Sequence, residues 1–191
     1  MNNDIRLFIG KFLDLPEEII TVFENLVEYT ELPPMSYLAK TGEYSTDFFI
    51  VKSGIVRSYY LNNDGKENTR ALFIPGYVTG PTSAMMRNIP SELNYQTLTK
   101  VTGYRGNFHE LIKLTEKHHE LALFYVKTLE DAFLKAEKII LDISTLNATE
   151  RYTALREKIP NIDNILAQKY IASYLNITPV QLSRIRKKMY L

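Results

Sequence analysis

The sequence predicts an α+β protein with an N-terminal antiparallel β-roll of the jelly-roll type, a long dimerisation helix, and a C-terminal helix-turn-helix with little or no wing. Three observations lead to this fold class. Residues 32–105 consist of short segments rich in β-branched and aromatic residues, separated by turn signals. Residues 117–146 contain no Gly or Pro and repeat apolar residues at helical spacing. Residues 168–191 have the pattern of two short helices joined by a tight turn.

The N-terminal segment is expected to be helical. Residues 4–31 repeat apolar side chains at helix-like intervals, and Pro16 after Asp14 is suited to the start of a second helix. We expect these helices to pack as a cap on the roll.

The β-roll prediction depends on turn signals that recur between the short apolar segments. These signals are Pro33-Pro34, Thr41-Gly42, Ser53-Gly54, Pro75-Gly76 and Gly80-Pro81. Residues 48–51 and 55–61 are the clearest strands, and Asn63-Asp64-Gly65 predicts a hairpin turn into a strand over 70–74. A roll of this kind can enclose a small ligand.

Two sets of side chains in the roll are candidates for binding an effector. The first is aromatic and comprises Tyr59, Tyr60, Phe73, Tyr77, Tyr95 and Tyr104. A mixed aromatic core with hydroxyls reaching the surface accounts for most of them better than a pocket does. The second set is Arg57, Arg70 and Arg87, which are candidates for anion contacts, although arginines alternating along strands usually face solvent. A small-molecule effector in the roll is therefore possible but unidentified.

The long helix over 117–146 is predicted to form a homodimer. Apolar residues alternate four and three apart along it, which is the spacing of a heptad seam. The predicted interface residues are Ala122, Tyr125, Leu129, Ala132, Ala136, Ile139 and Ile143. A second apolar line runs beside this seam through Val126, Phe133 and Ile140, so one line can face the roll while the other meets a second copy. A helix buried within a monomer would also explain both lines.

The C-terminal stretch matches the helix-turn-helix pattern at every position. The small Ala172 allows two helices to cross closely, and Asn176 tolerates the left-handed backbone of the corner. Thr178 is suited to cap the second helix, with Pro179 at its first position. The outward face of that helix predicts DNA contacts from Thr178, Gln181, Ser183, Arg184, Lys187 and Lys188. The alternative is a structural helical hairpin whose charged face is merely solvated.

Charge and composition agree with a cytoplasmic nucleic-acid-binding protein. Residues 148–191 contain eight Lys or Arg and three acidic residues, whereas the chain as a whole carries +1. A basic module on an acidic body favours phosphate contacts. Without cysteine, disulfides and cysteine-ligated metal or iron–sulfur sites are excluded, and we expect no cofactor. The N-terminus has no signal-peptide pattern, and the longest apolar run, Leu121–Val126, is too short to span a membrane.

The sequence does not predict an enzyme. His118 and His119 are adjacent and point to different sides of a helix, so they do not form a metal pair. No carboxylate pair and no Ser–His–Asp set can be located, and we assign no metal. A metal-dependent enzyme with a double-stranded β-helix fold would need a cluster of histidines and carboxylates on the strands, but no histidine precedes His109.

In its order of elements, the chain resembles the Crp/Fnr family of bacterial transcription regulators. The residues that carry the resemblance are FFIVKSGIVRSYYLNNDGKENTRALFIPG (48–76) and ERYTALREKIPNI…IASYLNITPVQLSRIRKK (150–188). The resemblance implies a cyclic-nucleotide-binding-like β-roll with N-terminal helices over 1–116. It further implies a dimerisation helix over 117–146 and a DNA-binding domain over 147–191.

The sequence departs from the family pattern in two places. Where cyclic-AMP binders carry Gly-Glu and later Arg-Ser, this chain has Gly80-Pro81 and Ser91-Glu92, so it lacks a carboxylate for the ribose and a guanidinium for the phosphate. Pro179 and Val180 stand where cyclic-AMP-type members place an Arg and a Glu that read bases. We expect Arg184 to contact guanine and Gln181 to contact adenine, with the lysines near the helix end on phosphates.

The function expected from the sequence is a dimeric, sequence-specific transcription regulator of the Crp/Fnr type that binds double-stranded DNA and does not respond to cyclic AMP. The alternative is a degenerate sensor or adaptor that uses the roll and the seam for protein partners, without specific DNA affinity.

Overall fold

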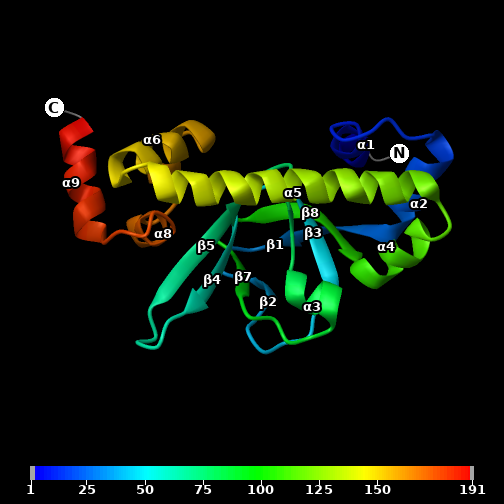
Figure 1. The fold of residues 1–191 in the computed structure, drawn as a ribbon, viewed down its shortest axis with the longest axis horizontal. Helices are drawn as coiled ribbons and strands as arrows, with labels where there is room; N and C mark the ends of the chain where they lie inside the picture. The colour runs from blue at the N-terminus through cyan, green and yellow to red at the C-terminus, as the bar shows by residue number, and fades with distance from the viewer. Residues whose placement is uncertain (1–2, 190–191) are drawn as a thin grey trace.

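The computed structural model describes residues 3–189. Figure 1 shows a β-roll lying along one side of the long helix α5 (His119–Thr145), which runs along the long axis of the molecule. Helices α1 (Asn3–Ile9), α2 (Glu17–Leu26) and α4 (Phe108–Thr115) gather at one end of α5. The C-terminal helices gather at the other end; they are α6 (Ala148–Lys158), α7 (Ile162–Ile165), α8 (Gln168–Tyr174) and α9 (Pro179–Met189). The predicted α+β fold class is confirmed.

The roll consists of two four-stranded antiparallel sheets. The first sheet has the order β1-β8-β3-β6 and contains β1 (Val27–Leu32), β8 (Val101–Asn107), β3 (Asp47–Ser53) and β6 (Val78–Thr79). The second has the order β2-β7-β4-β5 and contains β2 (Tyr37–Ala39), β7 (Asn94–Thr97), β4 (Val56–Leu61) and β5 (Glu67–Phe73). A short helix, α3 (Thr82–Arg87), lies between β6 and β7. Since β5 has only one neighbouring strand, it is an edge of the second sheet.

The prediction of helix over residues 4–31 is wrong for its last five residues. Val27 to Leu32 form β1, which pairs with β8 from Val27 opposite Gly106 to Leu32 opposite Val101. The apolar spacing in this segment fits either structure. The segment forms a strand because its backbone hydrogen bonds are made to β8, which lies about 75 residues later in the chain.

The predicted hairpin turn is confirmed between β4 and β5. Asn62 accepts hydrogen bonds through its side-chain oxygen from the backbone amides of Asp64 (3.1 Å) and Lys66 (2.9 Å). Gly65 has φ +74°, a left-handed conformation that glycine adopts without strain. The strand that follows begins at Glu67, three residues before the predicted start.

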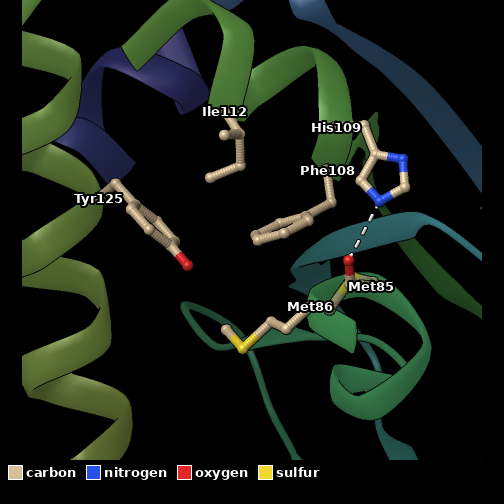
Figure 2. Close-up of a pocket in the computed structure, with 6 residues that line it drawn as sticks. All are labelled: Met85, Met86, Phe108, His109, Ile112 and Tyr125. Atoms are coloured by element: carbon tan, nitrogen blue, oxygen red, sulfur yellow. Dashed lines mark hydrogen bonds between the residues drawn. The ribbon is translucent and has the colours of Figure 1, made fainter. Parts of the chain in front are cut away.

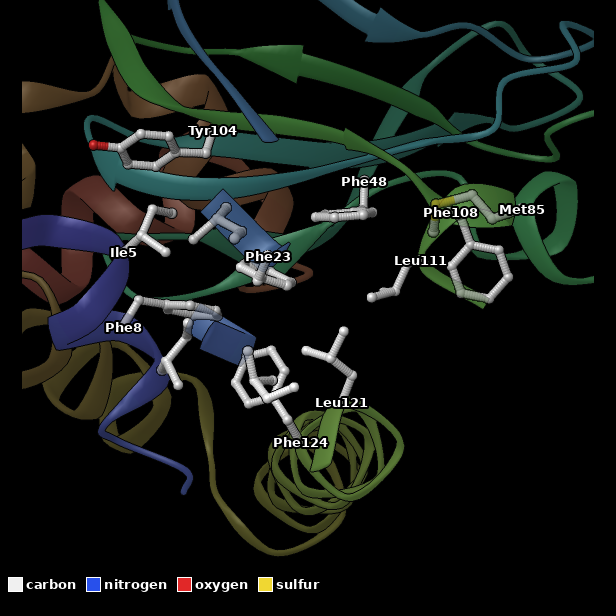
Figure 3. Packing of buried hydrophobic residues seen from close by; sticks show 13 residues of the cluster. Ile5, Phe8, Phe23, Phe48, Met85, Tyr104, Phe108, Leu111, Leu121 and Phe124 are labelled. Carbon is white, nitrogen blue, oxygen red and sulfur yellow. The ribbon is translucent and has the colours of Figure 1, made fainter. Parts of the chain in front are cut away.

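The first hydrophobic core fastens the start of α5 to the N-terminal helices and the roll (Figure 3). Phe124 joins α5 to both N-terminal helices, with its ring edge-on to Phe8 at 6.1 Å and to Phe23 at 5.3 Å between centroids. Leu121, one turn earlier, is also fully buried. Beyond Phe124, no residue of α5 is buried in the described structure, so the rest of this helix lies over the body with one side open.

The second hydrophobic core joins the C-terminal helices to the roll. Its residues from these helices and their connections are Tyr152, Leu155, Ile159, Ile162, Leu166, Ile171, Ala172, Leu175 and Leu182. Ile55 and Leu72 of the roll belong to the same cluster. The C-terminal helices therefore complete their core against the β-roll instead of packing only on one another.

Candidate nucleic-acid interface

The corner between α8 and α9 has the geometry that its sequence predicts. Asn176 adopts φ +53°, and the amide of Ile177 donates to the carbonyl oxygen of Ala172 at 3.0 Å. Ala172 is buried beneath α9, together with Leu182 of that helix. Within residues 3–189 no strand follows β8, and α9 ends at Met189, so the described part of the chain contains no wing.

The start of α9 is fixed by a reciprocal cap. The Thr178 hydroxyl accepts a hydrogen bond from the amide of Gln181 at 3.1 Å, as the sequence predicts. In return, Gln181 Oε1 accepts from the amide of Thr178 at 2.8 Å and lies 3.1 Å from its hydroxyl. This is a capping box with Gln in the third position, a local Thr-x-x-Gln signal that the sequence analysis missed. Both side chains therefore serve first to hold the helix end.

Besides Gln181, whose side chain holds the cap, four of the predicted DNA contacts are exposed along α9. They are Ser183, Arg184, Lys187 and Lys188. Within residues 3–189 no ion pair involves Arg184, Lys187 or Lys188. These three cations thus form a basic face that the folded chain leaves open to solvent.

Arg186, on the opposite side of α9, has a structural role. Its guanidinium pairs with Asp163, and its Nε donates to the Tyr152 hydroxyl at 3.2 Å. That hydroxyl in turn donates to Asp163 Oδ2 at 2.6 Å. Burial, followed by this hydrogen bond, raises the pKa of the Tyr152 hydroxyl, which keeps it a donor. The network fixes α9 against α6 and α7. Arg186 is therefore already paired within residues 3–189, unlike the cations on the other side of the helix.

Helix α8 closes the open edge of the second sheet. The amide of Thr69 on β5 donates to Ser173 Oγ at 2.9 Å, and Ser173 Oγ donates to the carbonyl oxygen of Glu67 at 3.1 Å. One serine thus satisfies a donor and an acceptor that an edge strand would leave unpaired. The DNA-reading candidate α9 is held to the roll through this contact and the shared core.

Arg57 strengthens the same junction and corrects the expectation that strand arginines face solvent. Only 1% of its side chain is exposed, and its Nη1 lies 2.6 Å from Glu67 Oε2. Its Nε and Nη2 donate to Gln96 Oε1 at 3.2 and 2.7 Å. The guanidinium lies 3.8 Å from the ring centroid of Tyr59 on the roll and 4.5 Å from that of Tyr170 on α8. A charge of the roll therefore contacts the first helix of the C-terminal pair.

The predicted dimer residues share one face of α5 but differ in exposure. Leu129, Ala132, Ala136 and Ile143 are exposed, whereas Ala122, Tyr125 and Ile139 are partly buried. The most exposed large side chains of the helix belong to the second apolar line, with Phe133 at 69% and Ile140 at 66%. The exposed seam therefore consists of Val126, Leu129, Phe133, Ala136, Ile140 and Ile143, still spaced three and four apart. It is rotated away from Tyr125, whose ring packs edge-on against Phe108 at 6.0 Å.

A cavity of about 540 Å³ lies where α3, α4 and α5 meet. Met85, Met86, Phe108, His109, Ile112 and Tyr125 line it, and Figure 2 shows the Tyr125 hydroxyl pointing into the space between them. None of the six aromatic residues considered for a ligand pocket is among these lining residues. Tyr59, Tyr95 and Tyr104 are buried, in agreement with a mixed aromatic core.

The segment between β6 and β7 has no buried group suited to a cyclic phosphate. Pro81 precedes the first residue of α3, and the buried Ser91 donates its hydroxyl to the carbonyl oxygen of Leu93 at 2.7 Å. Arg87 and Glu92 are both exposed. The only guanidinium of residues 78–94 therefore lies at the surface.

We expect no measurable binding of cyclic AMP or cyclic GMP at micromolar concentration. The segment between β6 and β7, which corresponds to the phosphate-binding cassette of cyclic-AMP binders, offers no buried cation to replace the hydration of the phosphate. Isothermal titration calorimetry checks this, with a cyclic-AMP-binding protein that has an intact cassette as the positive control. Micromolar affinity for either nucleotide would contradict the expectation and place the anion site on other arginines.

Comparison with known proteins agrees with this geometry. Residues 29–118 match the family model described as the cyclic nucleotide-binding domain. A solved structure of a putative Crp/Fnr-family transcriptional regulator from Eubacterium rectale superimposes with a TM-score of 0.74, covering 99% of this chain and 88% of that chain at 15% identity. The chain has the Crp/Fnr fold. FixK2 from Bradyrhizobium japonicum superimposes with a TM-score of 0.70 over 86% of this chain and 84% of that chain, at 18% identity.

Curated relatives are similar in sequence as well. The chain is 25% identical over 132 residues to an anaerobic regulatory protein of Aggregatibacter actinomycetemcomitans, covering 69% of this chain and 51% of the relative. It is 23% identical over 141 residues to the protein of that name in Haemophilus influenzae, covering 73% of this chain and 54% of that relative. The chain spans about half the length of these relatives. The resemblance to Crp/Fnr regulators is confirmed. Among the described residues, no helix is both long and apolar enough to cross a bilayer.

Proposed function

We propose that the protein is a dimeric, sequence-specific transcription regulator of the Crp/Fnr type that acts on DNA in the cytoplasm and does not respond to cyclic AMP. The observation that carries this proposal is that the cations of α9 have two different roles. Arg186 is fixed to Asp163, whereas Arg184, Lys187 and Lys188 remain exposed and without an ion pair in the described residues. A helix with such an open basic face, capped and held by a second helix, is suited to the major groove.

The assignment of residues follows from this geometry. Arg184, in the middle of the exposed face, is placed to make a bidentate contact to guanine. Lys187 and Lys188, in the last turns, are suited to phosphates. Thr178 and Gln181 fix the start of the helix, so we assign them to positioning, with Ser183 as a smaller contact.

The operator should be an imperfect palindrome. Two copies joined along the exposed seam of α5 would each present one α9, because α9 lies beyond the end of α5 that carries the C-terminal helices (Figure 1). In a helix-turn-helix dimer the half-site centres are separated by roughly 34 Å, one turn of B-DNA. Residues 1–116, 117–146 and 147–191 would then serve as sensor, dimerisation and DNA-binding parts.

Substitutions on α9 test the proposal against genomic fragments selected by the purified protein. Arg184→Ala is expected to weaken binding by about 1–3 kcal/mol and to relax preference at one base position of each half-site. Lys188→Ala is expected to weaken all sequences alike and to lower the slope of log affinity against log salt by about one. Fluorescence anisotropy at several salt concentrations measures both effects.

Lys117→Ala is the matched control, since it removes an exposed cation just before the far end of α5. It should change neither affinity nor salt slope. If Arg184→Ala and Lys188→Ala both behave like this control, α9 does not read DNA. The adaptor function, in which the roll and the seam bind protein partners, would then be favoured.

A further inference from the structure

An exposed apolar side chain, Val180, lies beside the basic residues of α9. Val180, the second residue of the helix, is 60% exposed and takes no part in the core beneath it. Valine is a poorer helix former than alanine, lysine or glutamine, and an exposed valine in a first turn adds nothing to the cap. Single exposed apolar residues are common, so the position of Val180 relative to its neighbours decides whether it has a role.

Val180 lies on the same stripe of α9 as the proposed base-reading arginine. Residues four apart share a helix face, which places Val180 beside Arg184, with Lys187 following three residues later. The two side chains that follow Val180 are committed elsewhere. Leu182 is buried, and Gln181 Oε1 accepts two hydrogen-bond contacts from Thr178.

Because Gln181 holds the helix cap, the adenine contact that the sequence predicts for it is not available in this conformation. A bidentate contact to adenine needs both the oxygen and the nitrogen of the amide, and here the oxygen holds the cap. Gln181 would have to give up the capping box to read a base. Val180 is left as the side chain in the first turn that is free, exposed and on the stripe of Arg184.

We infer that Val180 reads the C5-methyl group of a thymine in the major groove, and that each half-site therefore contains a thymine close to the guanine contacted by Arg184. This inference rests on the proposed function. Apolar contact with the methyl group is how side chains distinguish thymine in that groove, and the N-terminal residues of a recognition helix contact base edges. Four residues of helix rise about 6 Å, so the two bases lie about two steps apart along the DNA.

The test uses the sequence that the wild-type protein selects from random duplexes. Each thymine is replaced in turn by deoxyuridine, which removes the C5-methyl group and leaves every hydrogen-bonding group in place. For the wild type, one such replacement per half-site should weaken binding about threefold to fivefold, the value of burying one methyl group. The sensitive thymine should lie about two base pairs from the position at which Arg184→Ala relaxes specificity.

Val180→Ser, which replaces the apolar branch with a hydroxyl, should bind the thymine and deoxyuridine duplexes equally well. Because the comparison is made within one variant, a general loss of affinity or stability does not affect it. Ser183→Ala, also exposed on α9, is the matched control and should keep the full preference for thymine.

Two outcomes would overturn the inference alone: a wild-type protein that is indifferent to every methyl group, or a Val180→Ser variant that keeps the preference. If the protein selects no sequence at all, the proposed function fails and the inference falls with it. Selection of a sequence without methyl sensitivity would leave the proposed function standing, so the two failures are distinguishable.

Discussion

Phe133→Asp in α5 is expected to convert the proposed homodimer to a monomer at micromolar concentration and to reduce affinity for a palindromic operator at least about 100-fold. Phe133 lies in the middle of the exposed seam, and its side chain is 69% exposed in the single chain. In a dimer it would be covered by the partner helix, where an unpaired carboxylate costs several kcal/mol, twice per dimer. A monomer would contact only one half-site and lose the gain of joint binding.

Leu141→Asp is the matched control for this substitution. Leu141 is also exposed on α5, but it lies outside the line from Val126 to Ile143 that forms the seam. This variant should stay dimeric and bind DNA like the wild type. Light scattering and analytical ultracentrifugation measure the oligomeric state, and circular dichroism confirms that the monomers are folded. A monomeric wild type, or a Phe133→Asp variant that remains dimeric, would rule out the seam.

Arg57→Leu is expected to lower the free energy of unfolding by about 2–4 kcal/mol. The substitution leaves Gln96 Oε1 without its donors and removes the cation between Tyr59 and Tyr170. Glu67, the ion-pair partner, is partly exposed and can be solvated by water, which limits the loss. Because Tyr170 belongs to α8, amide hydrogen exchange in α8 should accelerate more than in the strands of the first sheet.

Urea denaturation measures the change, with Arg70→Leu as the control. Arg70 is an exposed arginine on the neighbouring strand β5, so the same substitution there should change stability by no more than about 0.5 kcal/mol. Equal stability losses in the two variants would show that the buried position of Arg57 carries no special weight. Unchanged exchange in α8 would show that the arginine stabilises the roll without holding the C-terminal helices.

The order of the main elements and the local geometry of the α8–α9 corner could be inferred from the sequence alone. Asn176, Thr178 and Ala172 act on backbone within a few residues of themselves, so their effects could be inferred without a partner. The length of α5 and the hairpin before β5 were predictable for the same reason. The capping role of Gln181 was within reach too, since the Thr-x-x-Gln pattern is local.

Other features depend on partners far away in the sequence and could not be predicted from local patterns. Val27 to Leu32 became a strand because β8 was available to pair with them. Arg57 became buried because Glu67, Gln96 and Tyr170 of α8 surround it. The seam of α5 was turned away from Tyr125 because α4 covers that side with Phe108. Periodicity shows that a helix has an apolar face, but which part of that face stays open depends on what packs against the rest of it.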